Sequence, residues 1–588
     1  MDTRWTSYYK ENEQRTDIDL TKSLYQTIAS VAAEIPDETA LEFGKVMFSY
    51  RRLLEEIDRA AASFLAIGIS EGDRVALCDN GVPSTIVSVY ALNKIGAVTC
   101  MVLHGIPRKG FTEQMVRCGC RFAIMPADLF DNVSGMIRDT VIETVILTRV
   151  GDYFTFWDKI NLGVRMLMSS DKYRYDPALM PDGFRLITWD KMMKEERDTK
   201  IISERERDVD SVSFLFFTGI TVHDSQSTVC ISDRAINSEA SLGLFMIGSR
   251  EGGQNRRRVM SFVEKAFVYG FCTGIHMPLA AGHTLVLCAA HDRGFPVPEL
   301  NFYKPDVFVG YPSIVSGFIG NSRVTDAALQ SLRTILSGGD LFGGASLNKV
   351  GSYLAERGSS AKIYQTYGIA ETMSVCIYKD SNDDDGRLLG IPLPGVAVKV
   401  CERDTMGEMP IGRKGEICVL TPARINGYLD DEDADNRTIR HQPDGRVWIM
   451  TGDIGHIDER GMIYFDGNSG RTFERLGTQI YPQLIESEIK NVYGVTDVCV
   501  VPVDNEDGSR DIVAVVVPVS DYLFNNDRLR NIKSSIELEC SLMLPPPMRP
   551  DQIEFRAYIP KRSYGSPDYE QIAKSVAENR LKITEKNE

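Results

Sequence analysis

The sequence Tyr367-Gly368-Ile369-Ala370-Glu371-Thr372 is the stretch that decides the fold. It follows a short strand-like run at residues 361–364 and sets a glycine beside an aromatic ring. Glu371 and Thr372 then stand where a carboxylate and a hydroxyl can meet a magnesium ion and an α-phosphate. A second stretch, Thr451-Gly452-Asp453, offers one carboxylate in a tight turn, which suits the two neighbouring hydroxyls of a ribose. Together the two stretches predict a site for ATP.

Seven further motifs accompany these two stretches along the chain. Each alone is weak evidence, because Gly-Gly and Gly-Asp pairs usually mark turns. In order and spacing, however, the whole set resembles the adenylate-forming superfamily, which includes acyl- and aryl-CoA synthetases, luciferases and the adenylation domains of peptide synthetases. The chain is most similar to an AMP-dependent acyl-CoA synthetase. The seven motifs are Phe48-Ser49-Tyr50-Arg51, Glu71-Gly72-Asp73-Arg74-Val75, Leu92-Asn93-Lys94-Ile95-Gly96-Ala97-Val98, Ser337-Gly338-Gly339-Asp340, Gly415-Glu416-Ile417, Gly427-Tyr428 and Ile480-Tyr481-Pro482.

The resemblance implies two half-reactions. A carboxylate attacks the α-phosphate of ATP to give an acyl-adenylate and pyrophosphate, and a thiol, usually that of coenzyme A, then displaces AMP. Glu371 is the implied magnesium ligand and Thr372 a phosphate contact, while Asp453 holds the ribose and Tyr367 stacks on the adenine. The residues implied to bind the nucleotide or coenzyme A are Thr218, Thr221, Gly338, Gly339, Asp340, Tyr367, Gly368, Asp453, Asn468, Arg471 and Gly477.

Several positions where the family usually has lysine or arginine hold other residues here, and these differences affect the expected catalytic turnover. The expected phosphate loop, residues 218–227, keeps one glycine and has no lysine, and Asn468 replaces the usual arginine, with Arg471 close by. In the C-terminal loop, Ser566 stands where the family delivers a catalytic lysine, and Lys561 can substitute only if the loop shifts by several residues. Losing one such cation typically costs about 3 to 4 kcal/mol of transition-state stabilisation. Two functions therefore stay open: an acid–thiol ligase, and a degenerate member that binds nucleotide, acyl-adenylate or acyl-CoA without turnover.

The amino-acid composition limits the classes of molecule that the protein is expected to bind. A net charge of -16 and a pI near 5.1 argue against binding to nucleic acid polymers or anionic lipid. The expected partners are a small carboxylic acid and coenzyme A, with a carrier protein as the alternative acceptor; Leu476-Gly477 resembles the lid segment of CoA ligases. The apolar side chains of Val263, Phe267 and Phe318 favour a hydrophobic acid, fatty or aromatic. The oligomeric state is not predicted.

The N-terminal sequence has no signal layout, so a cytoplasmic protein is expected. Most of the 12 cysteines lie in apolar runs as small hydrophobes, which predicts reduced thiols. Cys118 and Cys120 flank a single glycine, and a metal site or redox pair is the alternative there.

Apolar runs of three to six residues alternate with helical patterns along most of the chain, which predicts a layered α/β fold with mostly parallel sheets. Residues 1–466 are the expected N-terminal body, ending in a small β-rich subdomain at about 395–466. The segment 467–470 contains two glycines and is the predicted hinge. Residues 471–588 are the predicted small α+β C-terminal lid.

Two apolar stretches allow alternatives. Residues 267–290 contain no charged side chain and are long enough to cross a bilayer, but their glycines and proline favour a buried helix followed by a strand at 283–288. Residues 154–168 are expected to pack as a core insertion, with an amphipathic surface helix that touches a membrane or covers an acyl tunnel as the alternative. The role of the surrounding insertion, 150–200, is left open.

Overall fold

The computed structural model describes most of the chain, with gaps. The described residues are 4–9, 18–78, 81–104, 106, 108–154, 180–195, 208–218, 227–248, 255–288, 296–339, 344–379, 387–402, 405–468, 470–475, 478–505, 510–560 and 567–587. Residues 155–179 and 196–200 of the 150–200 insertion lie outside them, so Phe154 is the only described residue of the stretch 154–168. The ring of Phe154 stacks on Phe43 at 5.2 Å between centroids.

One sheet has eight strands in the order β19-β9-β8-β4-β3-β5-β6-β7. The strands from β8 to β7 run parallel, whereas β9 and β19 are added antiparallel at one edge. The bounds are β3 (Arg74–Cys78), β4 (Val98–Val102), β5 (Phe122–Pro126), β6 (Thr144–Thr148), β7 (Arg185–Thr188), β8 (Val212–Phe217), β9 (Thr228–Ser232) and β19 (Gly427–Tyr428). The short strand β19 comes from far along the chain, and it brings Tyr428 to this sheet.

The larger sheet has fourteen strands, of which β1, β11, β10, β12, β13 and β14 form a parallel centre. The strands of the predicted β-rich subdomain at about 395–466 continue this sheet, because β22 pairs with β16. The bounds are β1 (Thr39–Phe43), β2 (Val46–Ser49), β10 (Arg258–Ser261), β11 (Thr284–Val286), β12 (Val307–Gly310), β13 (Thr334–Ser337), β14 (Lys362–Tyr367), β15 (Ile377–Lys379), β16 (Leu388–Pro392), β17 (Ala397–Cys401), β18 (Gly415–Leu420), β20 (Ile439–His441), β21 (Val447–Ile457) and β22 (Ile463–Asn468). The α/β prediction is confirmed, with large mixed sheets.

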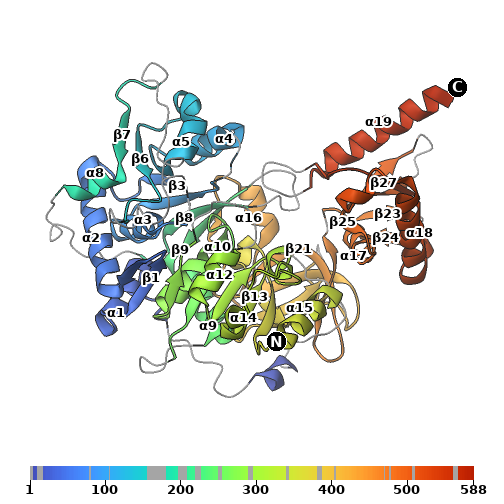
Figure 1. Cartoon of the computed structure of the whole chain (residues 1–588), viewed down its shortest axis with the longest axis horizontal. Coiled ribbons are helices and arrows are strands. Elements are labelled where there is room, and N and C mark those ends of the chain that lie inside the picture. Colours follow the sequence, from blue (N-terminus) through green and yellow to red (C-terminus); the bar gives the residue numbers. More distant parts are fainter. Residues whose placement is uncertain are drawn as a thin grey trace.

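Helices lie around both sheets (Figure 1). Capping residues define where individual helices begin and end. Helix α2 begins where the Ser49 hydroxyl accepts a hydrogen bond from the Arg52 backbone N–H. It ends at Gly68, whose φ of 103° favours glycine. The bounds in the body are α1 (Leu24–Glu34), α2 (Tyr50–Ile67), α3 (Pro83–Lys94), α4 (Arg108–Cys118), α5 (Ala127–Val133), α8 (Trp189–Lys194), α9 (Asp233–Ile247), α10 (Val268–Phe271), α11 (Met277–Ala280), α12 (Val297–Tyr303), α13 (Pro312–Ser316), α14 (Asp326–Ser331), α15 (Gly344–Glu356) and α16 (Glu432–Thr438).

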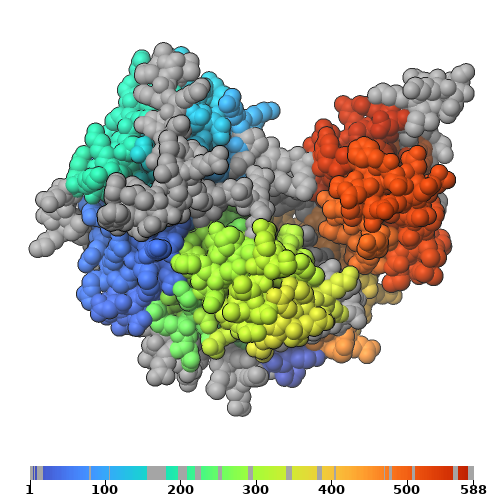
Figure 2. Space-filling view, viewed as in Figure 1, coloured from blue at the N-terminus to red at the C-terminus, as the bar shows by residue number. Residues whose placement is uncertain are grey.

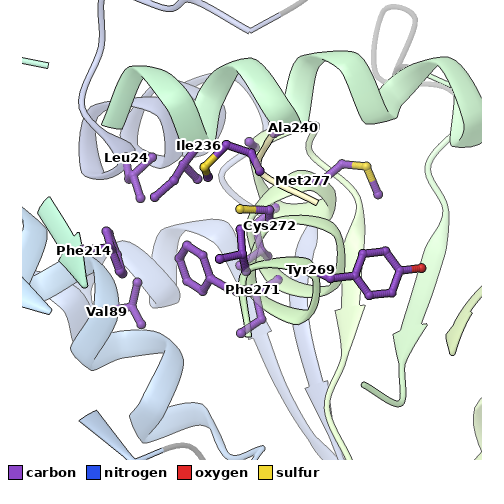
Figure 3. Packing of buried hydrophobic residues seen from close by; sticks show 14 of the residues in the cluster. Leu24, Val89, Phe214, Ile236, Ala240, Tyr269, Phe271, Cys272 and Met277 are labelled. Carbon is purple, nitrogen blue, oxygen red and sulfur yellow. The ribbon is translucent and has the colours of Figure 1, made fainter. Parts of the chain in front are cut away.

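The uncharged stretch 267–290 is confirmed as a buried helical segment followed by a strand. It folds into α10, a π-helical turn at Cys272–His276, α11 and then β11. Phe271 of α10 packs on Phe214 of β8 at 4.9 Å between ring centroids, and Figure 3 shows Tyr269 of the same helix pointing away from this contact. Within the described residues, no helix is long and apolar enough to cross a bilayer.

The C-terminal segment has its own sheet and core, and it forms the orange and red lobe of Figure 2. Its elements are β23 (Phe473–Arg475), β24 (Thr478–Ile480), α17 (Pro482–Lys490), β25 (Val495–Asp504), β26 (Arg510–Pro518), α18 (Asn526–Met543), β27 (Gln552–Phe555) and α19 (Tyr569–Asn587). The predicted hinge 467–470 is only partly outside regular structure. Gly467 and Asn468 belong to β22 and pair with Ile454 and Asp453 of β21.

Candidate active site

The stretch 367–372 forms the end of β14 and the turn beyond it. Gly368 has no room for a side chain, because a Cβ there would collide with the Ser374 backbone carbonyl. Thr372 is fully buried, and its hydroxyl accepts from the Ile369 backbone N–H at 3.1 Å. That hydroxyl closes the turn, and the phosphate contact predicted for Thr372 stays a prediction. The closed turn holds Glu371.

Glu371 is 2% exposed, and one of its carboxylate oxygens is engaged. The Tyr428 hydroxyl donates to Oε1 at 2.6 Å, whereas Oε2 has no hydrogen-bond partner among the described residues. Burial raises the pKa of Glu371, and the bond from Tyr428 lowers it in part. An unpaired buried carboxylate oxygen is costly unless a ligand completes it. Such an oxygen fits a magnesium ion, which takes one or two protein carboxylates together with phosphates and water.

Asp453 is buried, and both of its oxygens accept hydrogen bonds. The Tyr367 hydroxyl donates to Oδ2 at 2.7 Å, and Asn468 Nδ2 donates to Oδ1 at 2.8 Å. The second bond follows from the sheet register, which sets Asn468 opposite Asp453. Burial raises the pKa of Asp453 from 3.8 to about 6, while the bonds from Tyr367 and Asn468 lower it. Each oxygen keeps a second lone pair, so the carboxylate can still accept from ribose hydroxyls.

The two carboxylates share one neighbourhood. Tyr367 bonds to Asp453 and stands four residues before Glu371, and the negative charge of Glu371 contributes to the raised pKa of Asp453. Neither carboxylate forms an ion pair among the described residues. The sequence missed two supporting groups: the Tyr428 hydroxyl, and Glu416, whose Oε1 accepts from the Gly452 backbone N–H at 2.9 Å. The motifs containing Tyr428 and Glu416 were recognised, but no role was predicted for either side chain.

Two glycines predicted to line the adenine lie next to this centre. A Cβ on Gly338 would lie 2.9 Å from the Tyr269 hydroxyl and would also collide with Thr366 Oγ1. A Cβ on Gly339, whose φ is 81°, would lie 2.9 Å from Tyr311 Cε1. Both positions therefore require glycine because of close neighbours.

Other predicted residues have structural partners. Thr218 is 2% exposed, and its hydroxyl donates to the Ser227 carbonyl at 3.2 Å. Arg471 lies in the C-terminal segment, where its guanidinium forms two bonds to Glu486 of 3.0 and 2.6 Å and stacks 3.8 Å from the Tyr569 ring centroid. The structure therefore does not bring Arg471 to Asp453. The predicted residues Thr221, Asp340, Gly477, Lys561 and Ser566 lie outside the described residues.

Two of the side chains expected to line the acid site are on different sides of the large sheet. Val263 packs in the cluster that contains Val309, and Phe318 packs in the cluster that contains Phe308. Because Phe308 and Val309 are adjacent in β12, they face opposite sides. Val263 and Phe318 therefore do not form one common wall.

The match to known families agrees with this geometry. A family model described as AMP-binding enzyme matches residues 28–429. The chain belongs to this family. A long-chain-fatty-acid–CoA ligase of Bacillus subtilis (strain 168) is 23% identical over 548 residues, covering 92% of this chain and 93% of that protein.

Solved structures share the fold. The anthranilate CoA ligase AuaEII, in complex with anthranoyl-AMP, superposes with a TM-score of 0.77 at 16% identity, covering 96% of this chain and 99% of that one. A benzoate CoA ligase from Burkholderia xenovorans LB400 has a TM-score of 0.75 at 16% identity, covering 94% and 100%. These likenesses confirm the adenylate-forming fold, which the sequence motifs indicated.

Proposed function

We propose that the protein activates a carboxylic acid with ATP and transfers the acyl group to coenzyme A. In the first step a carboxylate oxygen of the acid attacks the α-phosphorus, and the bond from that phosphorus to the bridging oxygen breaks to release pyrophosphate. In the second step the thiolate of coenzyme A attacks the acyl carbon and AMP leaves. The observation that carries the proposal is the pair of buried carboxylates, Glu371 and Asp453, joined through Tyr367 in a chain of the AMP-binding family.

Each residue has a defined part. Asp453, held by Tyr367 and Asn468, accepts hydrogen bonds from the ribose and so fixes the nucleotide. The free oxygen of Glu371 would hold a magnesium ion, which when bound neutralises phosphate charge. Tyr428 orients that carboxylate and leaves Oε2 free. Orientation of this kind allows a bound ion to act without rearrangement of the site.

Pyrophosphate exchange tests the first step directly. The full chain is incubated with ATP, magnesium, labelled pyrophosphate and single acids from a panel of fatty and aromatic acids. At least one acid should promote exchange. Asp453→Asn should reduce that exchange, whereas Asp182→Asn, at an exposed position, should leave it unchanged. Formation of AMP and a thioester on addition of coenzyme A tests the second step.

The second candidate is a nucleotide- or acyl-CoA-binding protein without turnover. It is favoured by Ser566, by Asn468 and by the absence of lysine from residues 218–227. Calorimetric binding of AMP or acyl-CoA, with no exchange for any acid, would support this candidate. Failure to bind ATP, AMP and acyl-CoA alike would contradict both.

A further inference from the structure

Glu239 is a buried carboxyl with an incomplete set of partners. It lies in the middle of α9 and is 2% exposed. Its Oε1 accepts from the Val375 backbone N–H at 3.0 Å, and its Oε2 has no hydrogen-bond partner among the described residues. No described Lys, Arg or His side chain forms an ion pair with it. Burial of a carboxyl in this state is expensive, so a fold that keeps one there has a use for it.

The carboxyl is joined to the candidate active site. Val375, its donor, follows Glu371 by four residues in the turn after β14, so one segment holds both carboxyls. Glu239 is also close enough to Tyr269, Cys272 and Cys376 for its charge to raise the pKa of each. Glu239 therefore lies between the π-helical segment and the turn that carries Glu371.

Tyr269 provides a polar group between Glu239 and the residues that we propose bind the nucleotide. Its ring belongs to the same apolar cluster as Phe271, and Figure 3 shows its hydroxyl directed away from Phe271. The hydroxyl ends beside Thr366 and 2.9 Å from the position of a Cβ on Gly338. Tyr367, the partner of Asp453, directly follows Thr366 at the end of the same strand. Polar groups thus run from Glu239 towards the two carboxylates.

We propose that Glu239 determines specificity by bonding to a hydroxyl or amino group on the body of the acid. The substrate is then a hydroxy- or amino-substituted carboxylic acid in place of a plain alkyl or aryl acid. This inference rests on the proposed acid activation, and it goes beyond the hydrophobic acid expected from the sequence. A site that contains a buried hydrogen-bonding group rejects an analogue without the matching group, because the buried group is left unpaired.

Binding of acyl-adenylate mimics tests the proposal without requiring turnover. The probes are the 5′-O-sulfamoyl adenosine derivatives of benzoic acid and of its ortho-, meta- and para-hydroxy and amino forms. Their dissociation constants for the full chain are measured by calorimetry, with AMP in parallel. At least one substituted probe should bind about tenfold to a hundredfold more tightly than the unsubstituted probe. Glu239→Leu should reduce this ratio to within about threefold, whereas Glu239→Gln, which keeps hydrogen-bonding atoms, should retain most of it.

The controls separate the possible failures. Glu459→Leu, at an exposed position, should leave the ratio unchanged. Equal binding of substituted and unsubstituted probes to the wild-type protein would overturn the role of Glu239, and this comparison needs no variant to fold. A preference that persists in Glu239→Leu would also overturn it. Absence of AMP binding would instead refute the proposed function, and the role of Glu239 with it.

Discussion

Replacement of Asp453 by asparagine should stabilise the ligand-free protein at neutral pH. Burial raises the pKa of Asp453 from 3.8 to about 6. Because each pKa unit corresponds to 1.36 kcal/mol, the ionised carboxylate costs the folded state about 3 kcal/mol of unfolding free energy. Asparagine has nearly the same shape and carries no charge, so it removes this cost. The new side chain can still bond to the Tyr367 hydroxyl, which both donates and accepts.

The sign depends on which state binds more protons. Between pH 3.8 and about 6 the folded state holds the proton that the unfolded state has lost. The contribution of Asp453 to stability is therefore complete below pH 3.8 and is lost as the pH rises to about 6. The stability of Asp453→Asn relative to wild type should accordingly rise by about 3 kcal/mol across this interval. Any change in hydrogen bonding that does not depend on pH shifts the whole difference curve and leaves its slope unchanged.

Urea unfolding between pH 3.5 and 8 measures this difference. The four tryptophans, Trp5, Trp157, Trp189 and Trp448, all precede the C-terminal segment, so their fluorescence follows the body. Asp182→Asn, an exposed replacement, is the control and should show a flat difference. A flat curve for Asp453→Asn would refute the reasoning, since it would mean that the folded protein does not disfavour the Asp453 charge. The same variant should bind AMP about tenfold to a hundredfold more weakly by calorimetry.

Three further predictions follow from individual contacts. Tyr428→Phe removes the donor to Glu371 and should lower the unfolding free energy by about 1.5 to 3 kcal/mol. The loss should be larger at pH 8 than at pH 5, because the hydrogen bond favours the ionised carboxylate. Urea titrations at both pH values measure it, with Tyr558→Phe as the exposed control. Gly368→Ala forces a Cβ against the Ser374 carbonyl and should cost about 1 to 3 kcal/mol in the same assay; an unchanged midpoint would contradict the close approach. Ser566→Lys restores a cation to the C-terminal loop and should raise pyrophosphate exchange about a hundredfold to a thousandfold if that loop reaches the site; exchange that stays at the wild-type level would show that it does not.

The sequence was sufficient to predict the architecture, and its local motifs singled out Glu371 and Asp453, whose roles in binding remain predictions. Alternation of apolar runs and helical patterns predicted the α/β layers, and the uncharged stretch 267–290 folds as expected. The partners of the carboxylates were harder to predict. Tyr428 reaches Glu371 through a two-residue strand at a sheet edge, and no periodicity marks so short an element.

Two predictions concern residues whose contacts the structure shows, although their predicted roles remain untested. Thr372 was expected to face phosphate, but residues 373 and 374 adopt positive φ values of 56° and 87° without being glycine, and the resulting turn buries the hydroxyl. Gly467 and Asn468 are predicted as part of the hinge because of their composition, and in the structure they form the end of β22. Gly467 is needed there for packing, since a Cβ would lie 2.7 Å from Tyr481 Cδ1. Composition alone does not distinguish a glycine that allows motion from one that allows contact.

The register at Asn468 has a consequence for the proposed lid. Because Asn468 pairs with Asp453 within the sheet, its side chain bonds directly to the carboxylate that we propose binds the ribose. Beyond it the chain enters a segment with its own core, anchored by Arg471 on Glu486 and Tyr569. A rotation of that segment would therefore bend the chain after residue 468 and leave the bond between Asn468 and Asp453 intact. If the protein works as proposed, the nucleotide would therefore stay bound to the same sheet through both half-reactions, while groups of the C-terminal segment change around it.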